Sequence, residues 1–281
     1  MKKHKIKHTL PRAVLTVALA FAALVLDSRC RLVTTRYTVA SSRLPAQFDG
    51  FKLVQLSDIH GAQFGEKNAR LLDLVRREEP DIIALTGDLA DEFTDMEVVD
   101  TLLGALTETA PVYYVSGNHE WASGLLPELE ALFDKHGVRY LRNECVVLEN
   151  GGENIVLSGV EDPNGWRDML EPDDVVDMIR RNHGNAFTVL LGHRNYWAQE
   201  YPDLQVDLVL CGHAHGGIVR LPVLGGVLGT GRVLFPDYVD GAHKVGQYTL
   251  IISRGIGQTP VAPRFLNNPE VVAVTLRSTE K

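Results

Sequence analysis

The chain has 281 residues, of which 45% are hydrophobic and 23% charged, and this is the composition of an ordinary globular protein. It excludes a disordered or collagen-like chain and a membrane protein with many spans. The 28 basic and 36 acidic side chains give a formal net charge of −8, which lacks the basic footprint of a nucleic-acid binder. At roughly 150 residues per domain, the length fits one large domain or two small ones.

The first 26 residues differ from the rest, because they contain no acid and five basic residues, Lys2, Lys3, Lys5, Lys7 and Arg12. An apolar run follows from Ala13 to Leu26, and as a helix it spans about 21 Å of a roughly 30 Å hydrocarbon core. No small-residue cleavage site follows, so an uncleaved anchor is favoured over a cleaved signal peptide or a buried helix. The excess of positive charge before the run places the N-terminus in the cytoplasm and the body on the outer face of the cytoplasmic membrane.

The body shows the alternation of short apolar runs and amphipathic stretches that is typical of an α/β domain. We assign residues 1–44 to a leader, an anchor and a linker, and 45–281 to one domain. Strands are expected at 51–56, 81–86, 112–115, 155–160, 188–191, 206–211, 248–253 and 271–276. Helices are expected near 67–78, 95–106, 125–135, 172–182 and 195–201. The glycine-rich segment 216–246 is expected to form loops and short strands.

The three cysteines, Cys30, Cys145 and Cys211, are odd in number and include no CxxC pair, so they support neither a disulfide framework nor a zinc ribbon. Cys211 ends an apolar run and is expected to be a small buried hydrophobic residue. The tryptophans Trp121, Trp166 and Trp197 are expected to serve packing.

Five of the apolar runs end in residues that bind metals, and in four of them a glycine comes directly before the polar residue. Glycine permits a sharp exit from a strand and a close approach of the backbone to a ligand. Since ligands bind beyond the carboxyl ends of parallel strands, the five ends are expected to meet in one pocket. The candidate metal ligands are Asp58, His60, Asp88, Asn118, His193, His213 and His215.

This donor set contains oxygen and nitrogen but no thiolate, and it is too large for one closed zinc site. Asp58 and His60, like His213 and His215, lie two residues apart, so an extended backbone would direct each pair to one side. Two divalent ions are expected, with manganese preferred, followed by iron, zinc and magnesium. Such a pair activates water and stabilises an in-line phosphoryl displacement, and Asp88 is the candidate bridging carboxylate.

Other polar positions are interpreted as structural. His136, His183 and His243 are isolated, Asp162 is expected to cap a turn, and the acidic run from Asp91 to Asp100 is expected to be the solvated start of a helix. Arg254 and Arg264 fit equally well a phosphate contact or an ion pair, and this choice stays open.

The ordered motifs Asp58-x-His60, Gly87-Asp88, Gly117-Asn118-His119-Glu120, Gly192-His193 and Gly212-His213-x-His215 resemble those of calcineurin-like metallophosphoesterases. The N-terminal anchor and the segments 213–217, 253–257 and 263–270 are similar to the small bacterial membrane-associated phosphodiesterases of the YkuE/YaeI type. The chain departs from that pattern at Ala214 and Ile218, and at Arg194-Asn195, where a proline-containing pair is common.

The resemblance implies a four-layer αββα sandwich of two mixed sheets with a two-metal centre between them. By motif, Asp58, His60 and His215 would bind the first ion, Asp88 would bridge, and Asn118, His193 and His213 would complete the second site. His119 would donate a proton to the leaving oxygen or stabilise the phosphoryl group.

The expected reaction is hydrolysis of a phosphodiester or pyrophosphate bond by a metal-bound hydroxide, on a small-molecule or lipid-linked substrate at the membrane. Nucleic acid is not expected as a partner. The alternatives are a hydrolase of a lipid-linked nucleotide-sugar pyrophosphate, a phosphoprotein phosphatase, and a catalytically dead sensor of phosphorylated ligands.

Overall fold

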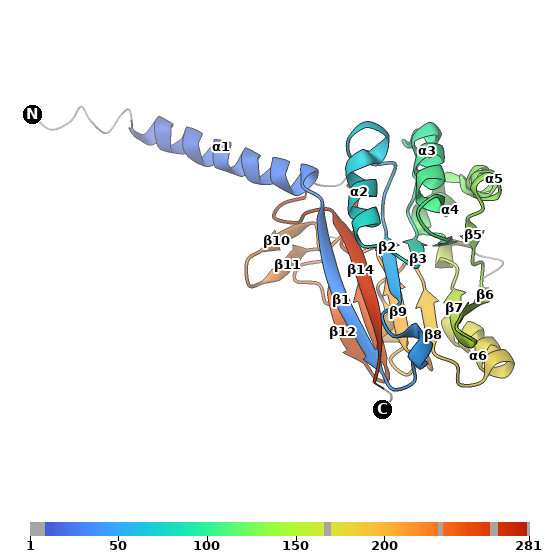
Figure 1. Ribbon diagram of the computed structural model, residues 1–281. Helices are drawn as coiled ribbons and strands as arrows, with labels where there is room; N and C mark the ends of the chain where they lie inside the picture. Colours follow the sequence, from blue (N-terminus) through green and yellow to red (C-terminus); the bar gives the residue numbers. More distant parts are fainter. Residues whose placement is uncertain (1–8, 166–169, 230–232, 259–263, 280–281) are drawn as a thin grey trace, which may run out of the picture.

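Two six-stranded mixed sheets form the centre of the molecule (Figure 1). The structure is a computed structural model and describes residues 9–165, 170–229, 233–258 and 264–279. The first sheet has the order β1 (Val33–Ser41), β14 (Glu270–Ser278), β2 (Lys52–Leu56), β3 (Ile82–Thr86), β4 (Val112–Val115) and β5 (Arg139–Tyr140). The second has the order β12 (Gly241–Val245), β13 (Tyr248–Ile252), β9 (Leu208–Cys211), β8 (Thr188–Leu191), β7 (Glu153–Gly159) and β6 (Cys145–Asn150).

The alternation of side chains along the strands builds four layers. In β2, Leu53 packs between the two sheets, whereas its neighbour Val54 packs against helices on the outer face. The outer face of the first sheet is covered by α2 (Ala69–Arg77), α3 (Met96–Thr107) and α5 (Leu126–His136), and that of the second by α6 (Pro172–His183) and α7 (Trp197–Glu200). The expected αββα sandwich is confirmed.

The strands and helices expected in the body are present at their predicted places, with ends shifted by a few residues. Strands β5 and β6 and the short helix α4 (Asn118–Ser123) were not expected from the sequence. Within the described residues, 3-10 turns connect the elements at η1 (Ala46–Phe48), η2 (Glu66–Asn68) and η3 (Pro163–Gly165).

The segment assigned to a linker before residue 45 contains a strand of the first sheet, so this assignment needs correction. Strand β1 pairs in parallel with β14 over its whole length, from Val33 opposite Glu270 to Ser41 opposite Ser278. The segment is rich in the β-branched residues that favour a pleated sheet. The folded body therefore begins near residue 33.

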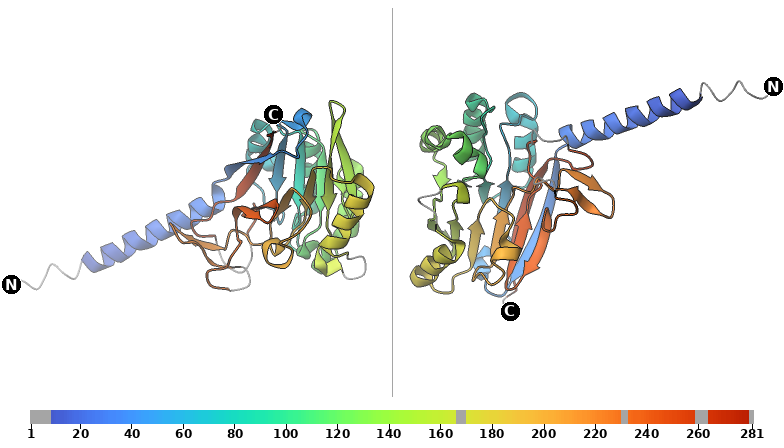
Figure 2. Two further views of the ribbon diagram at one scale, coloured as in Figure 1. Left: turned by 90° about the horizontal axis from the view of Figure 1, so that it is seen from below. Right: turned by 180° about the vertical axis from the view of Figure 1, so that it is seen from behind.

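Helix α1 (Thr9–Cys30) leaves the body and projects away from it (Figures 1 and 2). Its window Ala13–Cys30 is long and apolar enough to cross a membrane, and only 6% of that window is buried against the rest of the molecule. A signal sequence has the same properties. The helix extends past the predicted run of residues 13–26, and the basic residues 2–7 lie outside the described residues.

The glycine-rich segment contains the expected loops and short strands. Strands β10 (Val219–Leu221) and β11 (Gly225–Leu228) form a hairpin that projects from the body on the same side as α1 (Figures 1 and 2). Phe265, which pairs with Val219 beside this hairpin, stacks on Phe21 of α1 with ring centroids 5.1 Å apart.

Replacing Leu53 by alanine should lower the free energy of unfolding by about 2–5 kcal/mol, because the side chain is fully buried between the two sheets. The matched control is Val147→Ala, since Val147 lies on edge strand β6 with 40% of its surface exposed. Urea unfolding of both variants in detergent, followed by tryptophan fluorescence, measures the difference. Equal losses in the two variants would contradict the packing of the two sheets on each other.

Candidate metal centre

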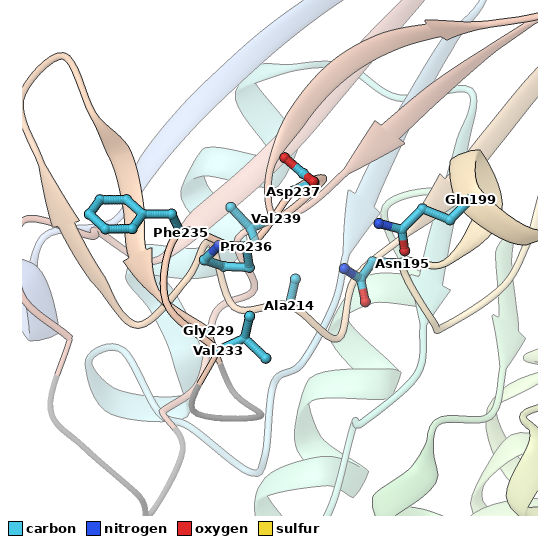
Figure 3. A pocket seen from close by; sticks show the side chains of 9 residues that line it. All are labelled: Asn195, Gln199, Ala214, Gly229, Val233, Phe235, Pro236, Asp237 and Val239. Atoms are coloured by element: carbon cyan, nitrogen blue, oxygen red, sulfur yellow. The ribbon is translucent and has the colours of Figure 1, made fainter.

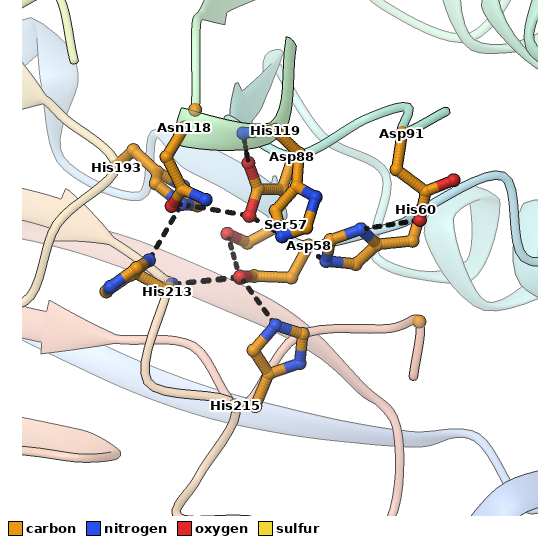
Figure 4. Close-up of polar contacts among 12 residues, drawn as sticks. Ser57, Asp58, His60, Asp88, Asp91, Asn118, His119, His193, His213 and His215 are labelled. Atoms are coloured by element: carbon orange, nitrogen blue, oxygen red, sulfur yellow. Dashed lines mark hydrogen bonds and ion pairs between the residues drawn. The ribbon is translucent and has the colours of Figure 1, made fainter. Parts of the chain in front are cut away.

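The seven predicted ligands follow the carboxyl ends of strands from both sheets, and the structure brings them together at the seam between these sheets (Figure 4). Sheet one contributes the residues after β2, β3 and β4, namely Asp58, His60, Asp88 and Asn118. Sheet two contributes those after β8 and β9, namely His193, His213 and His215.

The first cluster comprises Asp58, His60, Asp88 and His215, whose potential ligand atoms all lie within 4.8 Å of one another. Nε2 of His215 is 3.2 Å from Oδ1 of Asp58, and Nε2 of His60 is 3.7 Å from Oδ2 of Asp88. This cluster has the composition of a divalent-cation site with mixed carboxylate and imidazole ligands.

The second cluster comprises Asp88, His193 and His213, again within 4.8 Å. Nε2 of His193 is 3.2 Å from Oδ2 of Asp88, and also 3.2 Å from Oδ1 of Asn118 and from Nδ1 of His213. Asn118, the first residue of α4, therefore adds an amide oxygen to this group.

Asp88 belongs to both clusters, and its carboxylate is held in one orientation. The backbone N–H of His119 donates to Oδ1 at 2.9 Å, which leaves Oδ2 directed between His60 and His193. An oxygen in that place can be shared by two cations.

Five of the seven candidate ligands have left-handed backbone conformations, with φ of 51° at Asp58, 48° at His60, 50° at Asp88, 67° at His213 and 48° at His215. The prediction of an extended backbone at Asp58 and His60, and at His213 and His215, is therefore wrong. A left-handed L-residue costs roughly 1–2 kcal/mol, and such strain persists where the surrounding structure imposes it.

The glycines before the ligands mainly provide room. A Cβ on Gly212 would collide with Oγ of Ser57 and Oδ2 of Asp58, and a Cβ on Gly87 would lie 2.5 Å from Nδ1 of His193. Gly87 also has φ of 81°, whereas Gly212 does not need a left-handed conformation. The close approach that the sequence analysis predicted is thus present.

The two histidines of the His-x-His motif are neutral at physiological pH. Burial, together with the positive charges of His193 and Arg194, lowers the pKa of His213 to about 3. Burial and the guanidinium of Arg264 keep the pKa of His215 well below its ordinary value. Neutral imidazole is the form that binds metal.

His193 shows that the cluster stabilises positive charge. Its Nδ1 donates a hydrogen bond to the carbonyl of Thr86 at 2.9 Å, which directs Nε2 toward Asp88 and Asn118. Burial lowers the pKa of this histidine, but the carboxylate of Asp88 outweighs burial and raises the pKa to about 10. A bound divalent ion would displace that proton and supply positive charge in its place.

His60 provides a second test of whether these residues suit a bound metal ion. Its side chain is 3% exposed, and within the described part of the chain Nε2 has no hydrogen-bond partner. An unpaired buried polar nitrogen is costly, and a metal ion would satisfy it. The residues present therefore fit a pair of divalent cations.

Asp91, assigned to a solvated acidic run, is instead buried and lies 3.2 Å from Nδ1 of His60. It also accepts hydrogen bonds from the backbone N–H of Phe93 and the hydroxyl of Thr94. A carboxylate behind a ligand histidine fixes the orientation of the imidazole ring. The helix begins only at Met96, where Asp95 caps the N–H of Glu97.

Glu120 has a structural role that the sequence analysis did not assign. Its buried carboxylate accepts hydrogen bonds from the backbone N–H groups of Asp88, Leu89, Ala90 and Gly117. These bonds hold the loop that carries Asp88, while burial and the charge of Asp88 raise the pKa of Glu120 to about 7. Its place three residues after Gly117, the residue that caps α4, was the available signal.

The turn role expected of Asp162 is present, because its Oδ1 accepts the backbone N–H of Asn164 at 2.9 Å. The same carboxylate also holds Arg194 through two bonds of 2.6 and 3.1 Å. Nη1 of Arg194 lies 3.3 Å from Nε2 of His213. The departure from the family pattern thus places a fixed cation beside the second cluster.

Contacts decide the open choice in favour of an ion pair for Arg254, whereas the choice stays open for Arg264. Arg254 pairs with Glu270 at 2.8 Å. Arg264 is buried, donates to the carbonyl of Gly257 and lies 3.3 Å from Nδ1 of His215.

His119 lies half-buried at the start of α4, and its ring meets that of His60 edge-on with centroids 4.8 Å apart. Its backbone is held by Asp88, so the ring stands beside the first cluster with part of its surface open to solvent. This is a suitable position for contact with a substrate bound at the clusters.

The described tryptophans, Cys211 and the isolated histidines have the structural contacts that were expected of them. Trp197 and Cys211 are buried in the core outside the second sheet, and Trp121 donates to the hydroxyl of Ser116. Trp166 lies outside the described residues. The isolated histidines contact Asp100 (His136), Cys145 (His183) and the carbonyl of Asp240 (His243).

A separate cavity of about 340 Å³ lies behind the His-x-His loop (Figure 3). Ala214, between the two ligand histidines, lines this cavity together with Asn195, Gln199 and the segment 233–239. None of the seven candidate ligands lines this cavity, so the cavity is distinct from the two ligand clusters.

Comparison with known proteins agrees with this geometry. The profile of the family described as calcineurin-like phosphoesterase matches residues 51–217. The uncharacterized metallophosphoesterase YkuE of Bacillus subtilis (strain 168) is 31% identical, over 88% of this chain and 86% of its own length. An uncharacterized metallophosphoesterase of Aquifex aeolicus (strain VF5) is 32% identical, over 92% of this chain and 98% of its own.

A Danio rerio relative named "Transmembrane protein with metallophosphoesterase domain" is 25% identical, over 96% of this chain and 63% of its own length. The matched profile covers more than half of the chain, and the bacterial relatives match it almost from end to end. The chain therefore belongs to the calcineurin-like metallophosphoesterase family and is a metal-dependent phosphoesterase.

Proposed function

We propose that this protein hydrolyses phosphodiester or pyrophosphate bonds with two divalent metal ions, and that α1 tethers it to the cytoplasmic membrane with the catalytic body on the outer face. The observation that carries the proposal is Asp88, whose Oδ2 faces both ligand clusters at once. The orientation across the membrane rests on the excess of basic residues before α1.

In this proposal Asp58, His60 and His215 would hold the first ion, Asn118, His193 and His213 would hold the second, and Asp88 would contribute to both sites. Manganese is the preferred metal, ahead of iron, zinc and magnesium, because the ligand set mixes carboxylate and imidazole. When bound, the two ions lower the pKa of a water and neutralise charge on the phosphoryl oxygens.

The protein's own groups complete the reaction. His119 stands at the open side of the first cluster and donates a proton to the oxygen of the leaving group. Arg194, held by Asp162, adds a fixed positive charge near the phosphoryl oxygens beside the second cluster.

Asp88→Asn should remove both metal and activity, because the neutral amide cannot replace a shared carboxylate. We expect a loss of metal affinity above the roughly 100-fold that outer-shell partners contribute. The measurement is metal content by mass spectrometry, and turnover of bis(p-nitrophenyl) phosphate after chelation and return of manganese, on the full chain in detergent.

Asp100→Asn is the matched control, since Asp100 pairs with Lys135 and His136 away from the clusters. Wild-type protein that binds metal but turns over neither diester nor monoester would contradict hydrolysis of soluble phosphoesters. It would favour a narrow lipid substrate or a sensor of phosphorylated ligands.

His119→Ala should retain both metal ions and lose turnover by about 10²–10⁴-fold on a substrate with an alkyl leaving group. The loss should be much smaller with p-nitrophenolate, which leaves without a proton. The measurement compares kcat for the two substrates, with metal content determined in parallel and His136→Ala as the control. An unchanged rate on the alkyl substrate would rule out the acid role.

A lipid-linked nucleotide-sugar pyrophosphate is the second candidate substrate, and a cavity supports it. This cavity, of about 380 Å³, lies between the C-terminal end of α1 and the ligand clusters. Its lining includes Arg29, Cys30, His60, Phe64 and Arg70. A ligand histidine and the end of the membrane helix therefore border one space, which suits a phosphate group attached to a lipid.

If the substrate is lipid-linked, CDP-diacylglycerol in mixed micelles should be hydrolysed with a higher kcat/KM than CDP-glycerol, which has the same pyrophosphate without acyl chains. Arg70→Ala should reduce the rate on the lipid more than the rate on the soluble compound. Arg76→Ala, on the exposed face of the same helix, is the control. Equal or greater efficiency on the soluble compound would remove the lipid preference.

A further inference from the structure

An exposed apolar ribbon lies beside α1. It consists of β10, β11 and the adjoining residues 233–235, which pair with β11 through Leu234 opposite Leu228 and the N–H of Phe235 on the carbonyl of Val227. Outside α1, the large apolar side chains that the structure describes as exposed are all on this ribbon except Phe93 and Val147. The ribbon's members are Leu221, Val223, Leu224, Val233, Leu234 and Phe235.

The tip of the ribbon is held in an unfavourable conformation. Val223 is completely exposed and has φ of 71°, although left-handed backbone is rare for a β-branched residue. In water, this residue is unfavourable both because its apolar side chain is exposed and because its backbone is strained. Strained residues of this kind cluster at functional sites.

The position of the ribbon along α1 gives its depth relative to a membrane. Phe21 of α1 stacks on Phe265, and Phe265 pairs with Val219 and accepts the N–H of Arg220 at the base of the ribbon. Nearer the end of the helix, Asn268 donates to the carbonyl of Asp27. The segment 265–268 therefore runs along the helix from the level of Phe21 to that of Asp27.

Phe21 lies five residues before Leu26, the last residue of the apolar run, and at 1.5 Å per residue this is about 7.5 Å inside the apolar part of the helix. When α1 enters a bilayer, the base of the ribbon reaches the same level. A depth of roughly 5–10 Å is that of surface-bound elements at the boundary of headgroups and acyl chains.

We propose that this ribbon is a second membrane contact, whose apolar side chains insert into the outer boundary of the lipid bilayer next to α1. The described residues of the ribbon, 219–229 and 233–235, contain one charged side chain, Arg220, which is paired with Asp240 at 2.9 Å. Among these described residues no unpaired charge opposes insertion. The contact fixes the tilt of the body on the membrane, so that the cavity between α1 and His60 opens at the level of the lipid headgroups.

The proposal rests on α1 entering the membrane but not on catalysis, and it is tested without an activity assay. In a full chain with Cys30→Ser and Cys145→Ser, Val223→Cys is labelled with the environment-sensitive fluorophore NBD. Cys211 is fully buried and does not react. Leu234→Cys is a second reporter on the same ribbon, and Val147→Cys is the matched control on edge strand β6, at the far end of the sheet.

The labelled chains are reconstituted in vesicles of phosphatidylcholine and phosphatidylglycerol. We expect emission at shorter wavelength from positions 223 and 234, quenching by lipids with a nitroxide on the acyl chain, and protection from aqueous iodide. The label at position 147 should emit at longer wavelength, should not be quenched by the nitroxide lipids, and should be quenched by iodide.

Iodide quenching of position 223 equal to that of position 147 would overturn the proposal. Protection of position 223 from both quenchers would also overturn it, because a protein rather than lipid would then cover the ribbon. Flotation of the vesicles identifies failure of α1 to insert, which would remove the basis of the proposal independently of enzyme activity.

Discussion

The burial of carboxylates at the seam between two sheets is the constraint on which the rest of the site depends. Asp58 and Asp88 are almost completely buried within one cluster, and such groups are tolerated only when cations or hydrogen-bond donors compensate them. Backbone N–H groups meet part of this need, since His213 donates to Asp58 and His119 donates to Asp88. The remaining negative charge raises the pKa of His193, and the same charge would stabilise divalent cations bound there.

The strained backbone follows from the same constraint. Each sheet ends its strands at one edge, and ligands from the two sheets converge where the chain turns sharply after β2, β3 and β9. The left-handed residues provide these turns, and Glu120 holds the Asp88 loop through its backbone N–H groups. The free energy stored in the turns is offset by the packing of the two sheets, whose shared core includes Leu53.

In the proposed function, membrane attachment and catalysis are linked by position. Helix α1 and the hairpin of β10 and β11 lie on one side of the body (Figure 2). The end of α1 also lines the cavity beside His60, and the hydrogen bond from Arg70 to the carbonyl of Cys30 ties this end of the helix to α2. A substrate held at the bilayer surface would thus reach the clusters without leaving the membrane. The acidic net charge of the body gives no electrostatic attraction to anionic lipids, so the proposed membrane contact rests on apolar side chains.

The sequence by itself determined an α/β domain and the identity of the seven clustered residues, because strand periodicity and the polar residue after each apolar run are local patterns. The four-layer arrangement of the sheets and helices was expected only from the resemblance to the family. It did not determine that β1 completes the first sheet, since an edge strand with partial burial lacks a strong alternating signal. It also missed Asp91, Glu120 and the contact of Arg194 with His213, whose partners lie 19 to 32 residues away in the chain. Only the tertiary structure decided which ligands share Asp88 and which apolar residues remain exposed beside α1. These properties depend on distances between segments, and a linear pattern of residues does not contain such distances.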